Sequence, residues 1–257
     1  MNALPSGVFA AFERDGYAVI RGVVPPAELA EFTATFMTVI PELPYPPGPD
    51  GVVREVTGLA RGYEPLTRIA CDPRFGALVG QALGAARVQL LQDSLLYKPA
   101  LEGASIEWHQ DRTYIGYLSP ARVATIRIAL LPEDEANGCM RVVEGSHHWG
   151  EIGANQSLTA QSVASLLPSL TAEQQARVEG ARSLELAPGD VSIHHCLTLH
   201  GSPPNPSARP RRTILLRMFD AACQLDPARL PPGAEAYFPV DADGHLATTA
   251  FPLVHGG

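Results

Sequence analysis

From residue 87 onward, the chain is a series of short apolar or alternating runs. Clusters of Gly, Pro, Asn and Asp separate the runs, which is the pattern of an all-β sandwich or barrel. We therefore expect an all-β core with flanking helices, folded as a jelly-roll barrel. One helix is expected to interrupt the strands at roughly 157–180. The runs are RVQLLQDSLLYKP, RVATIRIALLP, CMRVVEG, RSLELAPGDVSIHH and RRTILLRMFD.

The N-terminal third is expected to supply most of the helices. Residues 5–16 and 73–84 each resemble a short helix, and YAVIRGVV at 17–24 is typical of a strand. Residues 25–40 place five apolar side chains at helical spacing behind two prolines, which predicts an amphipathic helix. We expect one domain over residues 1–257, divided into a helical support of about 1–85 and a jelly-roll core of about 86–222.

A proline-rich segment, PELPYPPGPDG at 41–51, is expected to be a loop. Proline removes a backbone donor and restricts the preceding residue, so no regular element survives five prolines in eleven residues. Long loops of this kind are often functional covers. Together with the segment around 150–175, this loop is predicted to close over a substrate and exclude water.

Composition excludes several classes of protein. Of the 257 residues, 46% are hydrophobic and 18% are charged, which is enough for a substantial core and argues against disorder. The net charge of -8 and the absence of long basic runs argue against a nucleic-acid partner. The start has neither a basic leader nor a long apolar run, so we expect no signal peptide and no membrane anchor. The four cysteines form no C-x-x-C pair, which fits reduced thiols in a cytoplasmic protein.

The stretch WHQD places His109 and Asp111 two residues apart. On an extended segment such side chains point the same way, and Fe(II) in oxygenases is held by two histidines and one carboxylate on one face. A later histidine must complete the set, and His200 has the most informative surroundings. Arg211 follows it by eleven residues (211 − 200), and a fixed guanidinium can bind the far carboxylate of a dicarboxylate co-substrate.

Alternatives remain at two places in this pattern. Arg212 replaces Arg211 as the clamp if the strand register places it inward. His194 shares strand parity with His200, so it is a candidate to hydrogen-bond a metal ligand, whereas His147, His148 and His195 are expected to be structural.

Five segments in order resemble the phytanoyl-CoA dioxygenase family of Fe(II)/2-oxoglutarate oxygenases. They are FERDGYAVIRGVV, LLYKP, WHQD, NGCMRVVEGSHHWG and HGSPPNPSARPRR, between residues 12 and 212. The resemblance implies a double-stranded β-helix (a jelly roll, cupin-like) with His109, Asp111 and His200 as iron ligands. It also implies that Arg211 grips the C5 carboxylate of 2-oxoglutarate and that Lys98 reaches the same co-substrate.

Further candidates surround this set. Gln92 shares strand parity with Lys98 and is assigned to the co-substrate as well. Arg127 stands where many family members have tryptophan, which raises the hypothesis of an anionic substrate. Tyr114 follows the metal motif and Arg217 shares the face of Arg211, so both are candidates to contact substrate. The carboxylate of Asp111 argues against a halogenase, because halogenases of this family replace it with a small residue.

The expected protein is therefore a dioxygenase that uses Fe(II), 2-oxoglutarate and O2. It oxidises, and most simply hydroxylates, an unactivated C–H bond of a small molecule while 2-oxoglutarate becomes succinate and CO2. Two rivals are a cupin-like metalloenzyme without 2-oxoglutarate, in which Arg211 has no purpose, and a non-catalytic ligand-binding member of the family. Neither a nucleic acid nor a membrane is expected as partner.

Overall fold

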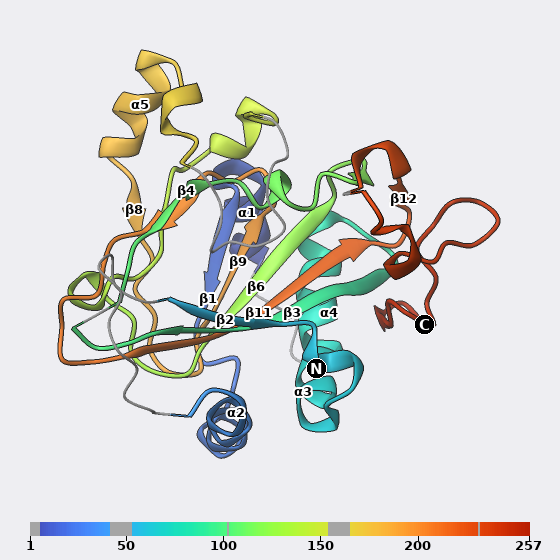
Figure 1. Cartoon of the computed structure of the whole chain (residues 1–257). Coiled ribbons are helices and arrows are strands. Elements are labelled where there is room, and N and C mark those ends of the chain that lie inside the picture. The colour runs from blue at the N-terminus through green and yellow to red at the C-terminus, as the bar shows by residue number, and fades with distance from the viewer. Residues whose placement is uncertain (1–5, 42–52, 102, 154–164, 231) are drawn as a thin grey trace.

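A seven-stranded antiparallel sheet forms the centre of the molecule (Figure 1). The structure is a computed structural model that describes residues 6–41, 53–101, 103–153, 165–230 and 232–257. The strands run in the order β1-β9-β6-β11-β3-β13, and β2 pairs with β3. They are β1 (Tyr17–Ile20), β2 (Arg54–Thr57), β3 (Val88–Lys98), β6 (Val123–Ala129), β9 (Val191–His195), β11 (Arg211–Asp220) and β13 (Leu253–His255).

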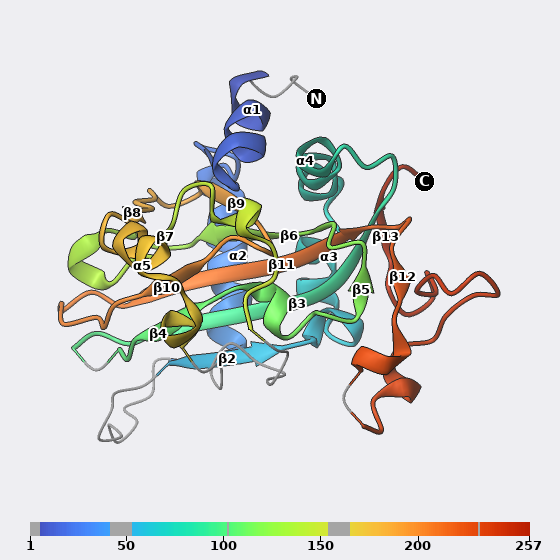
Figure 2. The ribbon, with the colours of Figure 1, turned by 90° about the horizontal axis from the view of Figure 1, so that it is seen from above.

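A smaller sheet of four short strands in the order β4-β10-β7-β8 accompanies it. Its strands are β4 (Ile106–His109), β7 (Arg141–Val142), β8 (Arg182–Ser183) and β10 (His200–Ser202). A third sheet pairs β5 (Leu118–Ser119) with β12 (Gln224–Leu225). Figure 2 shows the small sheet beside the long strands β3, β6 and β11. This arrangement agrees with the predicted jelly-roll core.

Five α-helices lie within the described residues, and four of them precede residue 85. They are α1 (Ser6–Asp15), α2 (Pro26–Val39), α3 (Glu64–Ala70), α4 (Pro73–Leu83) and α5 (Ala172–Glu179). The helices predicted at 5–16, 25–40 and 73–84 are therefore confirmed, and α3 was not predicted. The helix predicted at 157–180 is confirmed over α5, whereas a 3-10 segment (Leu167–Ser169) precedes the capping residue Thr171 in the rest of its described part.

The predicted strand at 17–24 is shorter than expected, since β1 ends at Ile20. The division into support and core stays a prediction, and β1, β2 and β13 join the large sheet from outside the range 86–222. Of the two proposed covering segments, residues 42–51 and 154–164 lie outside the described part of the chain, so closure over a substrate stays a prediction. Cys139, Cys196 and Cys223 are buried free thiols, and Cys71 is a half-buried one.

Strand alternation divides the large sheet into two faces with different chemistry. On β11, Ile214 and Leu216 are fully buried in one apolar cluster with Phe36 of α2 and Phe75 of α4. On the other face of β11, Arg211, Leu215 and Arg217 line a cavity between the two sheets. The helices thus stabilise one face of the sheet, and the opposite face is available for polar residues.

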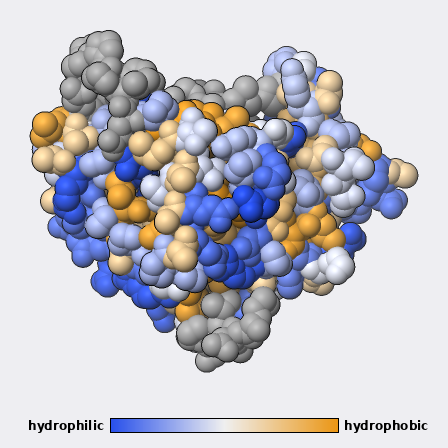
Figure 3. All heavy atoms as spheres, turned by 90° about the horizontal axis from the view of Figure 1, so that it is seen from below, coloured by the Kyte–Doolittle hydropathy of each residue, from blue (hydrophilic) through white to orange (hydrophobic). Residues whose placement is uncertain are grey.

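The outer side of the helical layer faces solvent. In the view of Figure 3, hydrophilic side chains gather in the middle of the face over α2 and α3. Arg68 there forms ion pairs with Glu31 of α2 and Glu64 of α3, at 2.8 and 2.9 Å. Among the described helices, none is long and apolar enough to cross a membrane.

Candidate active site

Three side chains with metal-binding atoms meet between the two sheets. His109 is the last residue of β4 and His200 is the first residue of β10, and the two pair directly in the antiparallel register. Asp111 begins the 3-10 turn that follows β4. Its Oδ1 lies 3.8 Å from Nε2 of His109 and 3.6 Å from Nε2 of His200. The sequence motif therefore brings its three predicted ligands together, and all three are buried.

Backbone carbonyls hold both imidazoles with Nε2 toward this gap. Nδ1 of His109 lies 2.7 Å from the carbonyl oxygen of Glu107, and Nδ1 of His200 lies 2.9 Å from that of Thr198. Each Nδ1–H donates to its carbonyl, which leaves the lone pair of Nε2 for a cation. Burial lowers the pKa of His109 and lowers that of His200 well below its ordinary value, so both imidazoles are neutral at pH 7.

The carboxyl group of Asp111 is ionised in the same environment. Burial raises its pKa, but the hydrogen bond from His194 and the charge of Arg217 outweigh burial and hold the pKa well below the usual range. Two neutral imidazoles and one carboxylate lie close together here. Such a ligand set is suited to Fe(II) and leaves coordination positions on the ion open for other ligands. The residues present thus fit the metal that the sequence predicts.

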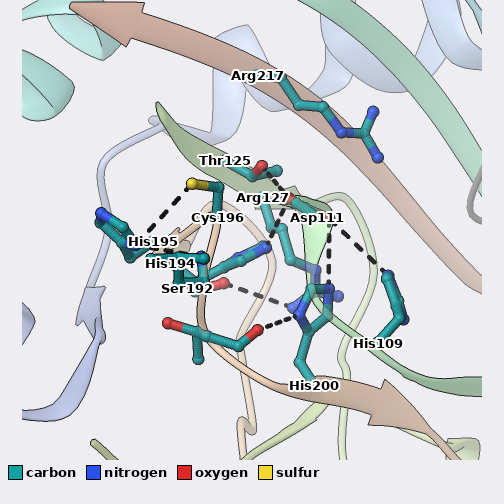
Figure 4. A network of polar contacts seen from close by, with 12 residues as sticks. His109, Asp111, Thr125, Arg127, Ser192, His194, His195, Cys196, His200 and Arg217 are labelled. Carbon is teal, nitrogen blue, oxygen red and sulfur yellow. Dashed lines mark hydrogen bonds and ion pairs between the residues drawn. The ribbon is translucent and has the colours of Figure 1, made fainter. Parts of the chain in front are cut away.

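Polar side chains from β6, from β9 and from its own 3-10 turn surround Asp111, and Figure 4 shows those of Thr125 and His194. Thr125 of β6 donates to Oδ2 at 2.5 Å, and Nε2 of His194 lies 3.2 Å from the same oxygen. The hydroxyl of Tyr114 donates to Oδ1. Burial raises the pKa of Tyr114 well above its ordinary value, so its hydroxyl keeps its proton. The structure places His194 beside a metal ligand, where strand parity suggested it, and Thr125 was missed.

Two buried basic side chains lie at one end of the same cavity, where Arg211 lines it and Lys98 contacts the lining residue Ser202. Lys98 and Arg211 are direct partners on β3 and β11, and they are 0% and 1% exposed. Nζ of Lys98 donates to Oγ of Ser202 at 2.8 Å and to the carbonyl of Pro203 at 2.6 Å. Arg211 donates to the carbonyl of Gly138, and its Nε has no partner among the described residues.

Strand register decides between the two candidate arginines. Arg211 lines the cavity that His109 and His200 also line. Arg212 pairs with Tyr97 in the register, and its guanidinium lies 5.7 Å from the centre of that ring. Because neighbours on a strand point to opposite faces, Arg212 is turned away from the cavity.

The positive charge at this end of the cavity is only partly compensated. Burial lowers the pKa of Lys98 to about 6, with the charge of Arg211 as a second cause. Burial also lowers the pKa of Arg211 to about 10, and the carboxylate of Glu133 opposes that change. Buried charges are costly unless they are paired, so this end fits a ligand that brings negative charge. The distal carboxylate of 2-oxoglutarate is such a group.

Arg127 lines the cavity but is paired internally. Its Nη2 donates to Oε2 of Glu133 at 2.7 Å, and Nη1 lies 3.4 Å from Oγ of Ser192. Thr213 donates to the other oxygen of Glu133 at 2.6 Å. The buried carboxylate of Glu133 thus neutralises the cation on which the hypothesis of an anionic substrate was based. Sequence reasoning missed Glu133 because it lies in a polar loop, LPEDEANG, that resembles an ordinary turn.

Arg217 lines the cavity from the next inward position along β11 after Leu215. Its Nη2 donates a hydrogen bond to the Tyr114 hydroxyl at 3.0 Å, and its Nη1 donates one to Oε1 of Gln92 at 3.1 Å. Gln92 itself lines a separate pocket, with Tyr117 and Phe251. The structure therefore brings Gln92 to Arg217 but not to Lys98 and Arg211, because six residues of β3 separate Gln92 from Lys98 by about 20 Å.

Comparisons with known proteins agree with this site. The profile of the family described as phytanoyl-CoA dioxygenase (PhyH) matches residues 12–213. The ectoine dioxygenase of Bordetella parapertussis is 29% identical over 237 residues, which cover 84% of this chain and 75% of that protein. The L-proline trans-4-hydroxylase of Streptomyces griseoviridis is 28% identical over 211 residues, with coverage of 74% and 78%.

Solved structures confirm the predicted double-stranded β-helix. The non-heme alpha ketoglutarate dependent carbocyclase of nogalamycin biosynthesis superposes with a TM-score of 0.77 at 22% identity. The match covers 98% of this chain and 96% of the carbocyclase. The family profile spans most of the chain, and the site has the metal-binding residues that the family requires. The chain belongs to the phytanoyl-CoA dioxygenase (PhyH) family of Fe(II)- and 2-oxoglutarate-dependent dioxygenases.

Proposed function

We propose that this protein hydroxylates an unactivated C–H bond of a small molecule and converts 2-oxoglutarate and O2 to succinate and CO2. One observation supports this most strongly. A closely spaced His109–Asp111–His200 set and two buried cations, Lys98 and Arg211, line or adjoin one cavity. A cavity with metal-binding residues and basic side chains suits a ligand that has a metal-chelating group at one end and a carboxylate at the other.

The residues of the site have two roles, metal binding and co-substrate binding. His109, Asp111 and His200 would hold Fe(II), and bound iron supplies the activation of O2 that C–H oxidation needs. Arg211 offers its unpartnered Nε edge to the distal carboxylate of 2-oxoglutarate, and Lys98 adds a second donor. The buried walls exclude water from the reacting atoms, which limits unproductive turnover.

The primary substrate belongs on the side of the metal set that faces away from Arg211. Tyr114 and Arg217 line the cavity as well, and Arg217 stands six residues beyond Arg211 on β11, so we assign this part of the cavity to the primary substrate. The ectoine dioxygenase and the proline hydroxylase are named for small-molecule substrates, and we extend that substrate class to this chain. Glu133 neutralises Arg127, and Oε1 of Glu55 lies 3.7 Å from Nη2 of Arg217, so neither arginine supports the hypothesis of an anionic substrate.

The first test is anaerobic and uses no substrate. Fe(II) and then 2-oxoglutarate are added to the purified protein, and the visible charge-transfer band of the chelate is recorded. We expect a band in the wild type, no band in Asp111→Ala, and weaker 2-oxoglutarate binding in Arg211→Met. Arg212→Met is the matched control, because Arg212 lies on the opposite face of the same strand.

Succinate formation with candidate small molecules completes this test. Bound metal without a band would favour the cupin-like metalloenzyme that works without 2-oxoglutarate. A band without succinate for any small molecule would favour the non-catalytic family member. Nε of Arg211, which has no partner among the described residues, disfavours the first rival, and the complete set of metal-binding residues disfavours the second.

A further inference from the structure

The carboxylate of Asp111 is fixed through the oxygen that points away from the two ligand histidines. Oδ2 accepts hydrogen bonds from Oγ1 of Thr125 at 2.5 Å and from Nε2 of His194 at 3.2 Å. Oδ1 is the oxygen that faces Nε2 of His109 and of His200. The two oxygens of one carboxylate therefore have different surroundings, and Figure 4 shows the contacts that converge on it.

The two donors come from neighbouring strands of the large sheet. Thr125 of β6 and His194 of β9 are direct partners in the antiparallel register. Both are 1% exposed, and both line the cavity. Two adjacent strands in the rigid centre of the sheet thus present their side chains to a single oxygen atom, while Asp111 itself lies on a turn outside the sheet.

The protons on these groups are determined by their partners. An ionised carboxylate can only accept hydrogen bonds, so the Thr125 hydroxyl and Nε2–H of His194 must both donate. Nδ1 of His194 is buried and has no partner among the described residues. The tautomer with its proton on Nε2 is therefore the one that the geometry supports, and both protons are directed at Oδ2.

A third donor acts on the other oxygen. The Tyr114 hydroxyl donates to Oδ1 and in turn accepts a hydrogen bond from Nη2 of Arg217 at 3.0 Å. A carboxylate offers about four lone-pair positions, and three donors occupy three of them. The remaining position is on Oδ1, on the side of the two histidines.

From this arrangement we propose that Thr125 and His194 are positioning residues that restrict Asp111 to coordination of the metal through Oδ1 alone. The proposal rests on the proposed function, because it concerns the same metal site. A six-coordinate ion with one atom from each protein ligand has three open positions, two for the 2-oxoglutarate chelate and one for O2. If Oδ2 also bound, the chelate and O2 would have to compete for the remaining two positions.

The experiment counts the waters on a probe metal instead of measuring turnover. Mn(II) is bound to the purified protein, and its electron paramagnetic resonance line is compared in ordinary water and in oxygen-17-enriched water. The broadening reports how many waters coordinate the ion. We expect three waters in the wild type and two in the Thr125→Val/His194→Leu double variant, in which Oδ2 is released to bind. With 2-oxoglutarate added, the expected counts are one and none.

Two further variants make the result specific. Ser192→Ala changes the residue two positions before His194 on β9, which contacts Arg127 and not Asp111, so its count should stay at three. Thr125→Ser keeps a hydroxyl donor at the position that Val removes, and it should also give three. Thermal unfolding of each variant verifies that it is folded before the waters are counted.

Two results would overturn the proposal. A count of two waters in the wild type would mean that both oxygens of Asp111 already bind the ion. A count of three in the folded double variant would mean that Thr125 and His194 do not determine the coordination. Neither result depends on 2-oxoglutarate turnover, so a failure of the proposed hydroxylation is detected separately, by the absence of the charge-transfer band and of succinate.

Discussion

Replacement of Arg211 by Met should weaken co-substrate binding and at the same time stabilise the protein that lacks co-substrate. Met retains much of the aliphatic volume of Arg211 but removes the charge and the donors. This guanidinium is 1% exposed and, among the described residues, donates to the carbonyl of Gly138 while its Nε has no partner. The carboxylate of Glu133 compensates its charge in part, and a ligand carboxylate would compensate the rest.

The two effects have different magnitudes and opposite signs. Truncating one partner of a buried charge pair costs about 2–5 kcal/mol, and Lys98 remains as a second donor, so we expect a loss of about 30- to 150-fold in 2-oxoglutarate affinity. The pKa of Arg211, about 10 against the ordinary 12.5, corresponds to about 3 kcal/mol of burial cost. Losing the donor to Gly138 costs about 1–2 kcal/mol. The net gain in unfolding free energy is about 1–2 kcal/mol.

The pH dependence of this gain has a definite sign. Arg211 has a folded pKa below its unfolded value, so its charge destabilises the folded protein at every pH below about 10, and the cost declines only as pH rises through that value. Urea unfolding at pH 7.5 without co-substrate measures the gain, and titration of the charge-transfer band measures the affinity. Arg212→Met is the control for both. An Arg211→Met protein that is less stable and binds 2-oxoglutarate normally would refute the assignment.

Three more perturbations follow from the site and the core. Lys98, with a pKa of about 6, is neutral at pH 8, and a bound carboxylate should raise that pKa. 2-Oxoglutarate binding should therefore take up a proton and weaken as pH rises above 6. Calorimetry in buffers of different ionisation enthalpy can detect the proton uptake, and Lys98→Met should abolish it. Glu133→Ala should lower the free energy of unfolding by about 3–5 kcal/mol, because Arg127 stays buried without its partner. The double variant Arg127→Met/Glu133→Leu should recover most of the loss, and equal losses in the two variants would contradict this reasoning. Phe36→Ala, at a fully buried position between α2 and the sheet, should cost about 3–5 kcal/mol in the same assay, and a loss below about 1 kcal/mol would contradict the described packing.

Local patterns predicted those features that depend on one segment of chain. The apolar spacing of residues 25–40 was enough for α2, because a helix buries one stripe of its own residues. Strand parity was enough to place Arg211 and Arg217 on one face of β11, since alternation holds within a strand. The same parity argument failed for Gln92, because a shared face says nothing about the distance along the strand.

Features that depend on the register between strands could not be read from the chain. Strand parity suggested His194, but Thr125 meets the same oxygen of Asp111 because β6 and β9 pair the two residues directly, and no spacing in the sequence encodes that pairing. Glu133 reaches Arg127 from a loop six residues later, where a carboxylate is usually solvated. Sequence reasoning therefore identified the charges of the site without the partners that neutralise them.

The distribution of charge along the cavity connects these observations. At the metal end, the carboxylate of Asp111 faces two neutral imidazoles and is balanced by Arg217. At the other end, the buried carboxylate of Glu133 faces three basic side chains, those of Lys98, Arg127 and Arg211. The excess of positive charge is reduced when Lys98 loses its proton or when a dicarboxylate binds. Both events relieve the same excess of positive charge. Because a bound carboxylate would raise the proton affinity of Lys98, co-substrate binding and protonation of this lysine should be coupled, and a monocarboxylate that chelates the metal without reaching Lys98 should bind without taking up a proton.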